Sequence, residues 1–160
     1  MSLFENDNYR WRGTYFVLFD AERRLTSEQI IAELRAIDSR NEVRDVRENE
    51  DGFESLTMIS PTDFAGMDVT YMMGEEVREQ ASDLIMELQE MMEEPEDQQK
   101  LDRLAACNAQ FEIYHFQQVT EQDDDDDDEM MDPGSLIVVL ERLAEECDGV
   151  AVDPQSSSFM

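Results

Sequence analysis

Negative charge is the feature that most restricts how this chain can fold. The sequence has 41 aspartate and glutamate residues against 12 lysine and arginine residues, for a formal net charge of −29. The imbalance is uneven, because residues 1–47 hold nine acids and eight arginines, whereas residues 48–160 carry a net charge of −28. Charged side chains stay in water unless they are paired. The acids must therefore lie on the surface, and the short apolar runs between them must supply the core.

The charge also restricts the partners of the protein. A negative field of this size repels nucleic acids and anionic lipid surfaces and attracts cations and basic proteins. We therefore expect no nucleic-acid partner and no membrane partner, and a basic protein is the partner that the charge favours. Adaptation to a saline cell or plain solubility explains the acidity equally well. Arg10, Arg12, Arg40, Arg44 and Arg47 either form a local basic patch or pair with neighbouring acids.

The lack of recognisable targeting signals and the use of cysteine predict a cytoplasmic location. No apolar run approaches the roughly 20 residues that a membrane-spanning helix needs, and no basic segment precedes an apolar stretch as in a signal peptide. Cys107 and Cys147 are the only cysteines. Their separation matches neither a metal motif nor a disulfide framework. We therefore expect two buried free thiols in a reducing compartment.

Length and composition predict one folded unit. A chain of 160 residues that is 41% hydrophobic favours a single domain rather than a disordered chain. We expect an N-terminal segment over 1–12, a single α/β domain over 13–153 and a flexible tail over 154–160. Residues 121–132, which include six consecutive aspartates, are predicted to form a disordered acidic loop within the domain.

Hydrophobic patterns predict alternating strands and helices. The apolar run at 13–19 is typical of a strand that is covered on both faces. Thr26 and Gln29 have the spacing of a capping box and begin a helix that should end near residues 39–41. The segment 62–74 shows no period and is predicted to be a loop, with a short extended piece near 69–72. The remaining strands are expected at 42–47, 53–59, 109–116 and 150–152. A second helix is expected from Glu75 to the region of Glu94, and a short helical turn at 101–107. A third helix is expected to begin at Pro133.

The order of these elements predicts an α+β fold. The first six elements follow the ferredoxin-like split βαβ pattern, βαββαβ. In that fold the first and third strands are central, and the second and fourth strands are at the edges. The charged segment 42–47 suits an edge strand. The C-terminal helix and strand are expected to extend this sheet.

Motifs for catalysis are missing from the sequence. His115 is the only histidine, and its alternating strand context favours a partly buried residue over a general base or metal ligand. The aspartate run fails as an EF-hand loop, because Asp128 stands where glycine is needed and Gly134 where a glutamate is needed. No nucleophile elbow or phosphate loop is present. We therefore predict no catalytic residue, no cofactor and no metal site, and the protein is expected not to be an enzyme.

The second predicted helix carries the best candidate for a binding surface. Its acids recur at three- and four-residue intervals, which places them on one side of a helix: Glu76, Glu79, Asp83, Glu87 and Glu90. We predict a non-enzymatic interaction protein of the inhibitor or immunity-like kind that docks a basic protein there. An ordinary solvated helix face is the competing interpretation. Two other functions stay open, a small-ligand-binding regulatory module of ferredoxin-like fold and a carboxylate or divalent-metal enzyme.

Overall fold

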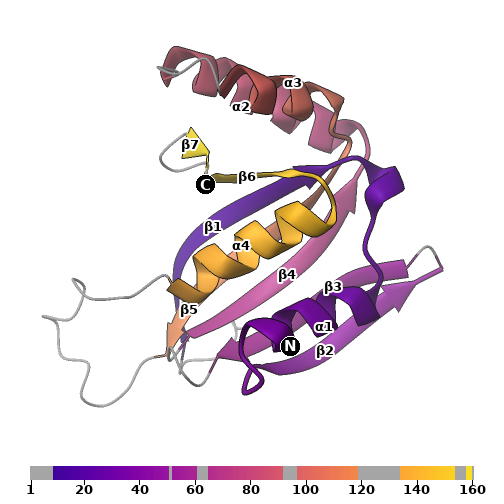
Figure 1. Cartoon of the computed structure of the whole chain (residues 1–160), viewed down its shortest axis with the longest axis vertical. Helices are drawn as coiled ribbons and strands as arrows, with labels where there is room; N and C mark the ends of the chain where they lie inside the picture. Colours follow the sequence, from indigo (N-terminus) through magenta and orange to yellow (C-terminus); the bar gives the residue numbers. More distant parts are fainter. Residues whose placement is uncertain are drawn as a thin grey trace, which may run out of the picture.

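One antiparallel sheet organises the protein (Figure 1). The computed structural model describes residues 9–50, 52–60, 65–91, 97–118, 134–153 and 158–159. In these residues seven strands pair in the order β2-β3-β4-β5-β1-β6-β7, each antiparallel to its neighbour. The strands are β1 (Tyr9–Phe19), β2 (Glu42–Asn49), β3 (Gly52–Ser60), β4 (Ala65–Met73), β5 (Ala109–Gln118), β6 (Val150–Asp153) and β7 (Ser158–Phe159). The helices are α1 (Ser27–Ile37), α2 (Glu75–Met91), α3 (Asp97–Ala106) and α4 (Gly134–Glu146), with a 3₁₀ turn η2 (Ala21–Arg23).

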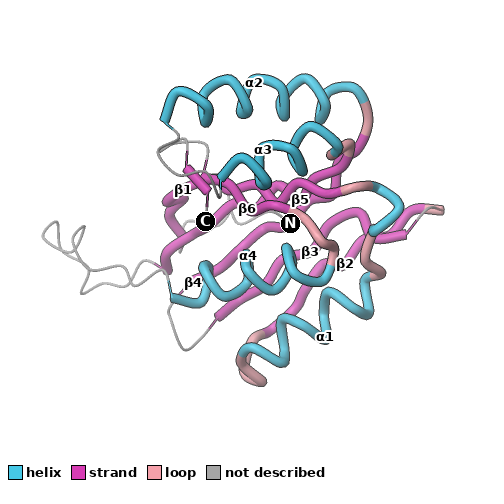
Figure 2. Tube along the Cα trace, turned by 45° about the horizontal axis from the view of Figure 1, so that its top comes forward, coloured by secondary structure: helices cyan, strands magenta, loops and turns pink. Residues whose placement is uncertain are grey.

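Helices pack on both faces of the sheet, and the side chains of β1 show how the faces divide. Successive side chains of a strand point to opposite faces. Val17 and Phe19 pack in a cluster with residues of α1 and α4, whereas Phe16 and Leu18 pack with residues of α2 and α3. All four side chains are buried, so β1 is covered on both sides, as its apolar run predicts. The views in Figures 1 and 2 show α2 and α3 at one end of the molecule and α1 at the other.

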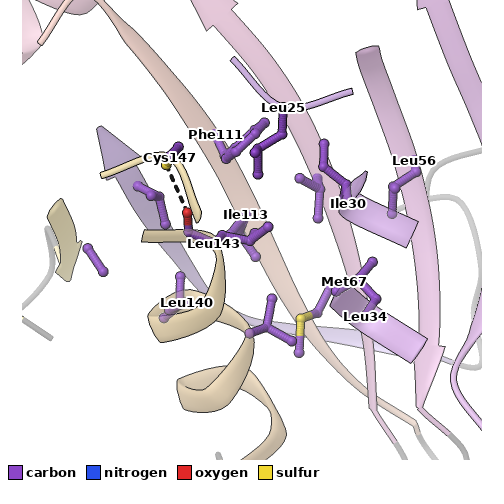
Figure 3. Packing of buried hydrophobic residues seen from close by; sticks show 14 of the residues in the cluster. Leu25, Ile30, Leu34, Leu56, Met67, Phe111, Ile113, Leu140, Leu143 and Cys147 are labelled. Atoms are coloured by element: carbon purple, nitrogen blue, oxygen red, sulfur yellow. Dashed lines mark hydrogen bonds between the residues drawn. The ribbon is translucent and has the colours of Figure 1, made fainter. Parts of the chain in front are cut away.

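The larger core lies between the sheet and the α1/α4 layer (Figure 3). The predicted capping box of α1 is confirmed, because Gln29 N donates to Thr26 Oγ1 at 3.1 Å and Thr26 N donates to Gln29 Oε1 at 2.9 Å. This cap fixes the start of α1, so that Ile30 and Leu34 face the sheet. Residues of the sheet, of α4 and of the segments next to α1 and α4 join them in the cluster: Leu25, Leu56, Met67, Phe111, Ile113, Leu140, Leu143 and Cys147.

The predicted α+β class is confirmed, but the ferredoxin-like core is not, because the sheet is larger. In the ferredoxin-like order, strand 53–59 would lie beside strand 13–19. In the structure β4 and β5 lie between β3 and β1. The segment 62–74 was predicted to be a loop, yet β4 occupies residues 65–73 and pairs with β3 and β5 along its length. Inserting this strand moves the 109–116 strand from the predicted edge into the interior of the sheet.

Several predicted boundaries also shift. The second strand does lie at the edge of the sheet, as its charge predicts. A register shift between Arg44 and Arg47, with Asp45 at a φ of 52°, interrupts its pairing with β3. The first strand begins at Tyr9 rather than at residue 13, so it includes part of the predicted N-terminal segment 1–12. Ser158 and Phe159, from the predicted tail 154–160, pair with β6 as β7. The predicted acidic loop 121–132 lies outside the described residues.

Candidate functional site

The acidic face of α2 is set by the apolar face opposite it. Val77, Ala81, Leu84 and Leu88 are buried against β1, β6 and α3, as their helical spacing predicts. The other side of the helix therefore points to solvent. Each acid predicted for this face is exposed: Glu76, Glu79, Asp83, Glu87 and Glu90. We call these five residues the α2 acidic face.

The α2 acidic face has little positive charge around it. Arg78 is the only base among residues 75–91, which contain six acids. In the described part of the chain, none of the ion pairs within 4.0 Å joins a base to Glu76, Glu79, Asp83 or Glu90. The last turn of α2 contains no base, although the negative end of the helix dipole disfavours acids there. The face is thus strongly negative, with Arg78 as the only base that residues 75–91 supply.

An exposed methionine interrupts the acids. Met86 lies three residues after Asp83 and four before Glu90, so all three side chains share one side of α2. Its side chain is 66% exposed. Methionine adapts its shape to apolar contacts and is common at binding surfaces. On the side of α2 that faces α3, a hollow of about 420 Å³ is lined partly by Arg78, Ser82 and Ile85. The surface therefore offers apolar contacts as well as charge.

A second group of polar side chains lies on the strands. Thr57 of β3 donates to Asp68 of β4 at 2.7 Å, and both side chains are buried. On β5 the Tyr114 hydroxyl donates to the Glu112 carboxylate. Burial first, and then the hydrogen bond to Glu112 and the negative charges of Glu112 and Asp68, together raise the pKa of Tyr114 to about 12. Tyr114 therefore stays protonated at neutral pH and acts as a hydrogen-bond donor within the sheet.

The histidine and the cysteines are buried. His115 is 3% exposed and follows Phe111 and Ile113 on the same face of β5, in agreement with a buried strand residue. Both cysteines are free, and burial raises the pKa of Cys107 to about 11 and that of Cys147 to about 12. The thiols donate to the carbonyl oxygens of Arg103 and Leu143, at 3.1 Å and 2.8 Å. Because the thiolate is the reactive form, neither cysteine is activated as a nucleophile.

In the described residues, no three histidine, cysteine, aspartate or glutamate residues group closely enough to hold a metal ion. The aspartate run Asp123–Asp128 lies outside those residues. None of the described helices combines the length and the apolar character needed to cross a bilayer.

The predicted pairing of arginines with nearby acids is confirmed for two of them. Arg40 contacts Asp38 at 3.4 Å, and Arg44 contacts Glu42 at 2.6 Å. Arg35, in the last turn of α1, lies close to these two arginines in the fold. The sequence pattern did not group it with them. The signal that could have done so is the short distance along the chain from Arg35 to Arg40, across the predicted end of the helix.

Comparisons of the chain with models of known protein families, with curated proteins and with solved structures found no match. The function is therefore inferred from the side chains that the fold presents.

Proposed function

We propose that this protein is a non-enzymatic interaction protein that docks a basic protein partner on the α2 acidic face. The observation that carries this proposal is the set of five exposed acids on one side of α2. Arg78 is the only basic residue in this helix. Like charges on one helix face repel one another and destabilise the helix. Residues that break a local stability rule are often found at functional sites. A basic partner would relieve this repulsion.

The partner is expected to combine basic and apolar groups. The 17 residues of α2 span about 25 Å at 1.5 Å per residue, which is long enough to meet roughly four to five turns of a parallel partner helix, or a short strand pair. Arginine or lysine side chains on the partner would meet the acids, and an apolar side chain would contact Met86. Complementary charge acts mainly on the rate of association and makes that rate depend on salt. The buried free thiols support a reducing compartment such as the cytoplasm as the place of action.

The described residues give less support to an enzyme. The histidine and both cysteines are buried, and the thiols and Tyr114 are held in their protonated forms. General acid–base catalysis works best when the pKa of the catalytic group is close to the working pH. The pKa values of these thiols and of Tyr114 lie far above it.

The test compares two variants with the same net charge. In the first variant, all five acids of the α2 acidic face are changed to glutamine or asparagine. In the matched control, five exposed acids on other elements are changed to glutamine: Glu28, Glu54, Glu141, Glu145 and Glu146. Each immobilised protein is used to recover partners from the source cell at low and moderate salt, and any recovered protein is purified and its association rate measured.

The proposal requires a basic protein that binds the wild type and the control but not the α2 variant. Its association rate with the wild type should fall as salt rises, because screening weakens electrostatic steering. Equal recovery by the α2 variant and the control would show that the α2 acidic face is an ordinary solvated surface. Loss of binding in both variants would show that total charge, rather than this face, determines the interaction.

A further inference from the structure

A groove of about 610 Å³ lies where α1 ends and β2 begins. Figure 1 shows α1 and β2 at the opposite end of the molecule from α2. Its lining includes three of the 12 bases in the chain, Arg35, Arg40 and Arg44. Glu42 is the one acid in the lining, and Asp38 lies beside it. With Asp38 and Glu42 counted, the three arginines leave a local excess of one positive charge in a protein with a net charge of −29.

The arginines keep donors available for a ligand. Arg40 and Arg44 each contact a neighbouring acid, but their side chains are 71% and 62% exposed. A guanidinium group has five N–H donors, and exposed ion pairs contribute only about 0–1 kcal/mol. An anion in the groove can therefore bind the remaining donors or displace the acids. No ion pair within 4.0 Å in the described part of the chain involves Arg35.

A buried amide in the same lining lacks one hydrogen bond. Asn41 is 4% exposed, and its Nδ2 donates to the carbonyl oxygen of Leu34 at 2.8 Å. This bond fixes the orientation of the amide and so the position of its oxygen, Oδ1. Among the described residues, no group donates a hydrogen bond to Oδ1. A buried polar atom without a partner costs about 1–3 kcal/mol and calls for an explanation such as a bound ligand or water. The groove thus combines anion-binding donors with one acceptor that lacks a donor.

Compensation of the helix dipole does not account for this arrangement. A base in the last turn of a helix interacts favourably with the negative end of the dipole, and Arg35 occupies that position in α1. Arg40 and Arg44 lie beyond the helix, and Arg44 belongs to β2. The dipole effect falls off within the last turn. The dipole therefore accounts for Arg35 alone, whereas Arg40 and Arg44 are held by their ion pairs with Asp38 and Glu42 and keep their other donors exposed.

We propose that this groove binds a small phosphate-bearing anion. Arginine groups match the geometry of phosphate oxygens and donate to them in pairs. Asn41 Oδ1 is covered in the structure, and a singly protonated phosphate that displaces this cover would supply the missing donor through its P–OH group, which the anionic oxygens cannot do. A small ligand fits better than a polyanion, because the charge of −29 repels a long negative molecule over the whole surface. This site is independent of the α2 acidic face and of the partner proposed for it.

The test is a titration with inorganic phosphate at pH 7 and constant ionic strength, followed by backbone amide NMR. We expect saturable shifts centred on residues 39–44 of the wild type. The variant Arg35→Gln/Arg40→Gln/Arg44→Gln should bind at least about tenfold more weakly, which corresponds to about 1.4 kcal/mol. A matched control, Arg23→Gln/Arg78→Gln/Arg103→Gln, has the same net charge and should bind as the wild type does.

Sulfate, a dianion without a proton at this pH, provides the second arm and should bind more weakly than phosphate. Should the triple variant fail to fold, Arg35→Gln alone leaves the Arg40–Asp38 and Arg44–Glu42 ion pairs in place and should still weaken binding. The proposal is overturned if phosphate causes no saturable shifts, if the groove variant binds as the control does, or if sulfate binds as tightly as phosphate.

Discussion

Two buried thiols and one tyrosine of this fold are kept in their neutral forms. Cys107 and Cys147 are buried and donate to backbone carbonyl oxygens, and Tyr114 donates to Glu112. In each case burial is the largest cause of the raised pKa, because it disfavours the charged form. The sequence indicates burial of the cysteines through their apolar helix positions. It cannot indicate the raised pKa values, because these depend on groups brought together from other elements.

The raised thiol pKa values predict a loss of stability in alkali. In the unfolded chain the thiols titrate near the ordinary value of 9.0, whereas in the folded protein they titrate near 11 and 12. The unfolded state therefore loses protons first as pH rises, and each thiol lowers the free energy of unfolding by up to about 1.4 kcal/mol per pH unit between those values. Urea denaturation at pH 8, 9, 10 and 11 should show no thiol effect at pH 8 and a steep decline above pH 9.

The variant Cys107→Ala/Cys147→Ala serves as the control for this titration. It should start from a lower stability, because two buried side chains are shortened, but its decline above pH 9 should be shallower than that of the wild type. A wild-type stability that stays constant from pH 9 to pH 11, or an equal decline in the variant, would contradict burial of the neutral thiols.

Single elements were predictable where local signals agree. The capping box starts α1 where the sequence places it, and α2 begins at Glu75 as predicted. The strand β4 was missed because its sequence, AGMDVTYMM, has no alternation and contains Gly66 and Asp68, which are rare in strands. Residues 65–69 are all buried, since β4 is an interior strand with both faces covered. The hydrogen bond from Thr57 offsets part of the cost of burying Asp68. Because Thr57 lies on another strand, the sequence of β4 alone does not reveal this partner.

The charges at the two ends of α2 predict opposite effects of the same substitution. Glu90 lies in the last turn, where the helix dipole disfavours an acid, and Glu76 lies in the first turn, where it favours one. Glu90→Gln should therefore raise the free energy of unfolding by about 0.3–1 kcal/mol, and Glu76→Gln should lower it by a similar amount. Urea denaturation at low salt would measure both. If both variants are stabilised equally, general repulsion rather than the dipole governs α2.

At the scale of the whole molecule, the order of strands could not be read from the order of elements. The pattern of strands and helices favoured a ferredoxin-like sheet, and the α+β class was correct. One unrecognised strand between β3 and α2 changed which strands are neighbours. The candidate surfaces follow the same division. The α2 acidic face depends on helical spacing and could be predicted from the sequence. The groove lined by Arg35, Arg40 and Arg44 lies where the chain reverses between α1 and β2, so it could be recognised only in the folded structure.

Net charge predicts that salt stabilises the molecule as a whole. A compact state with a charge of −29 repels itself more than the extended unfolded chain does. The Debye length falls from about 10 Å at 0.1 M salt to about 3 Å at 1 M, so salt screens this repulsion. The melting temperature should therefore rise steadily from 0.05 M to 1 M sodium chloride, with each 1 kcal/mol of added stability worth about 2–4 °C in a protein of this size.

Two comparisons separate screening from other effects of salt in this experiment. Potassium chloride should act as sodium chloride does, because screening depends on ionic strength rather than on the identity of the cation. The variant with a neutralised α2 acidic face should melt higher at low salt and gain less from added salt, since part of the repulsion is already removed. A melting temperature that stays constant or falls with sodium chloride would mean that the acids of the folded protein are already paired or bound by cations. Repulsion would then not limit its stability.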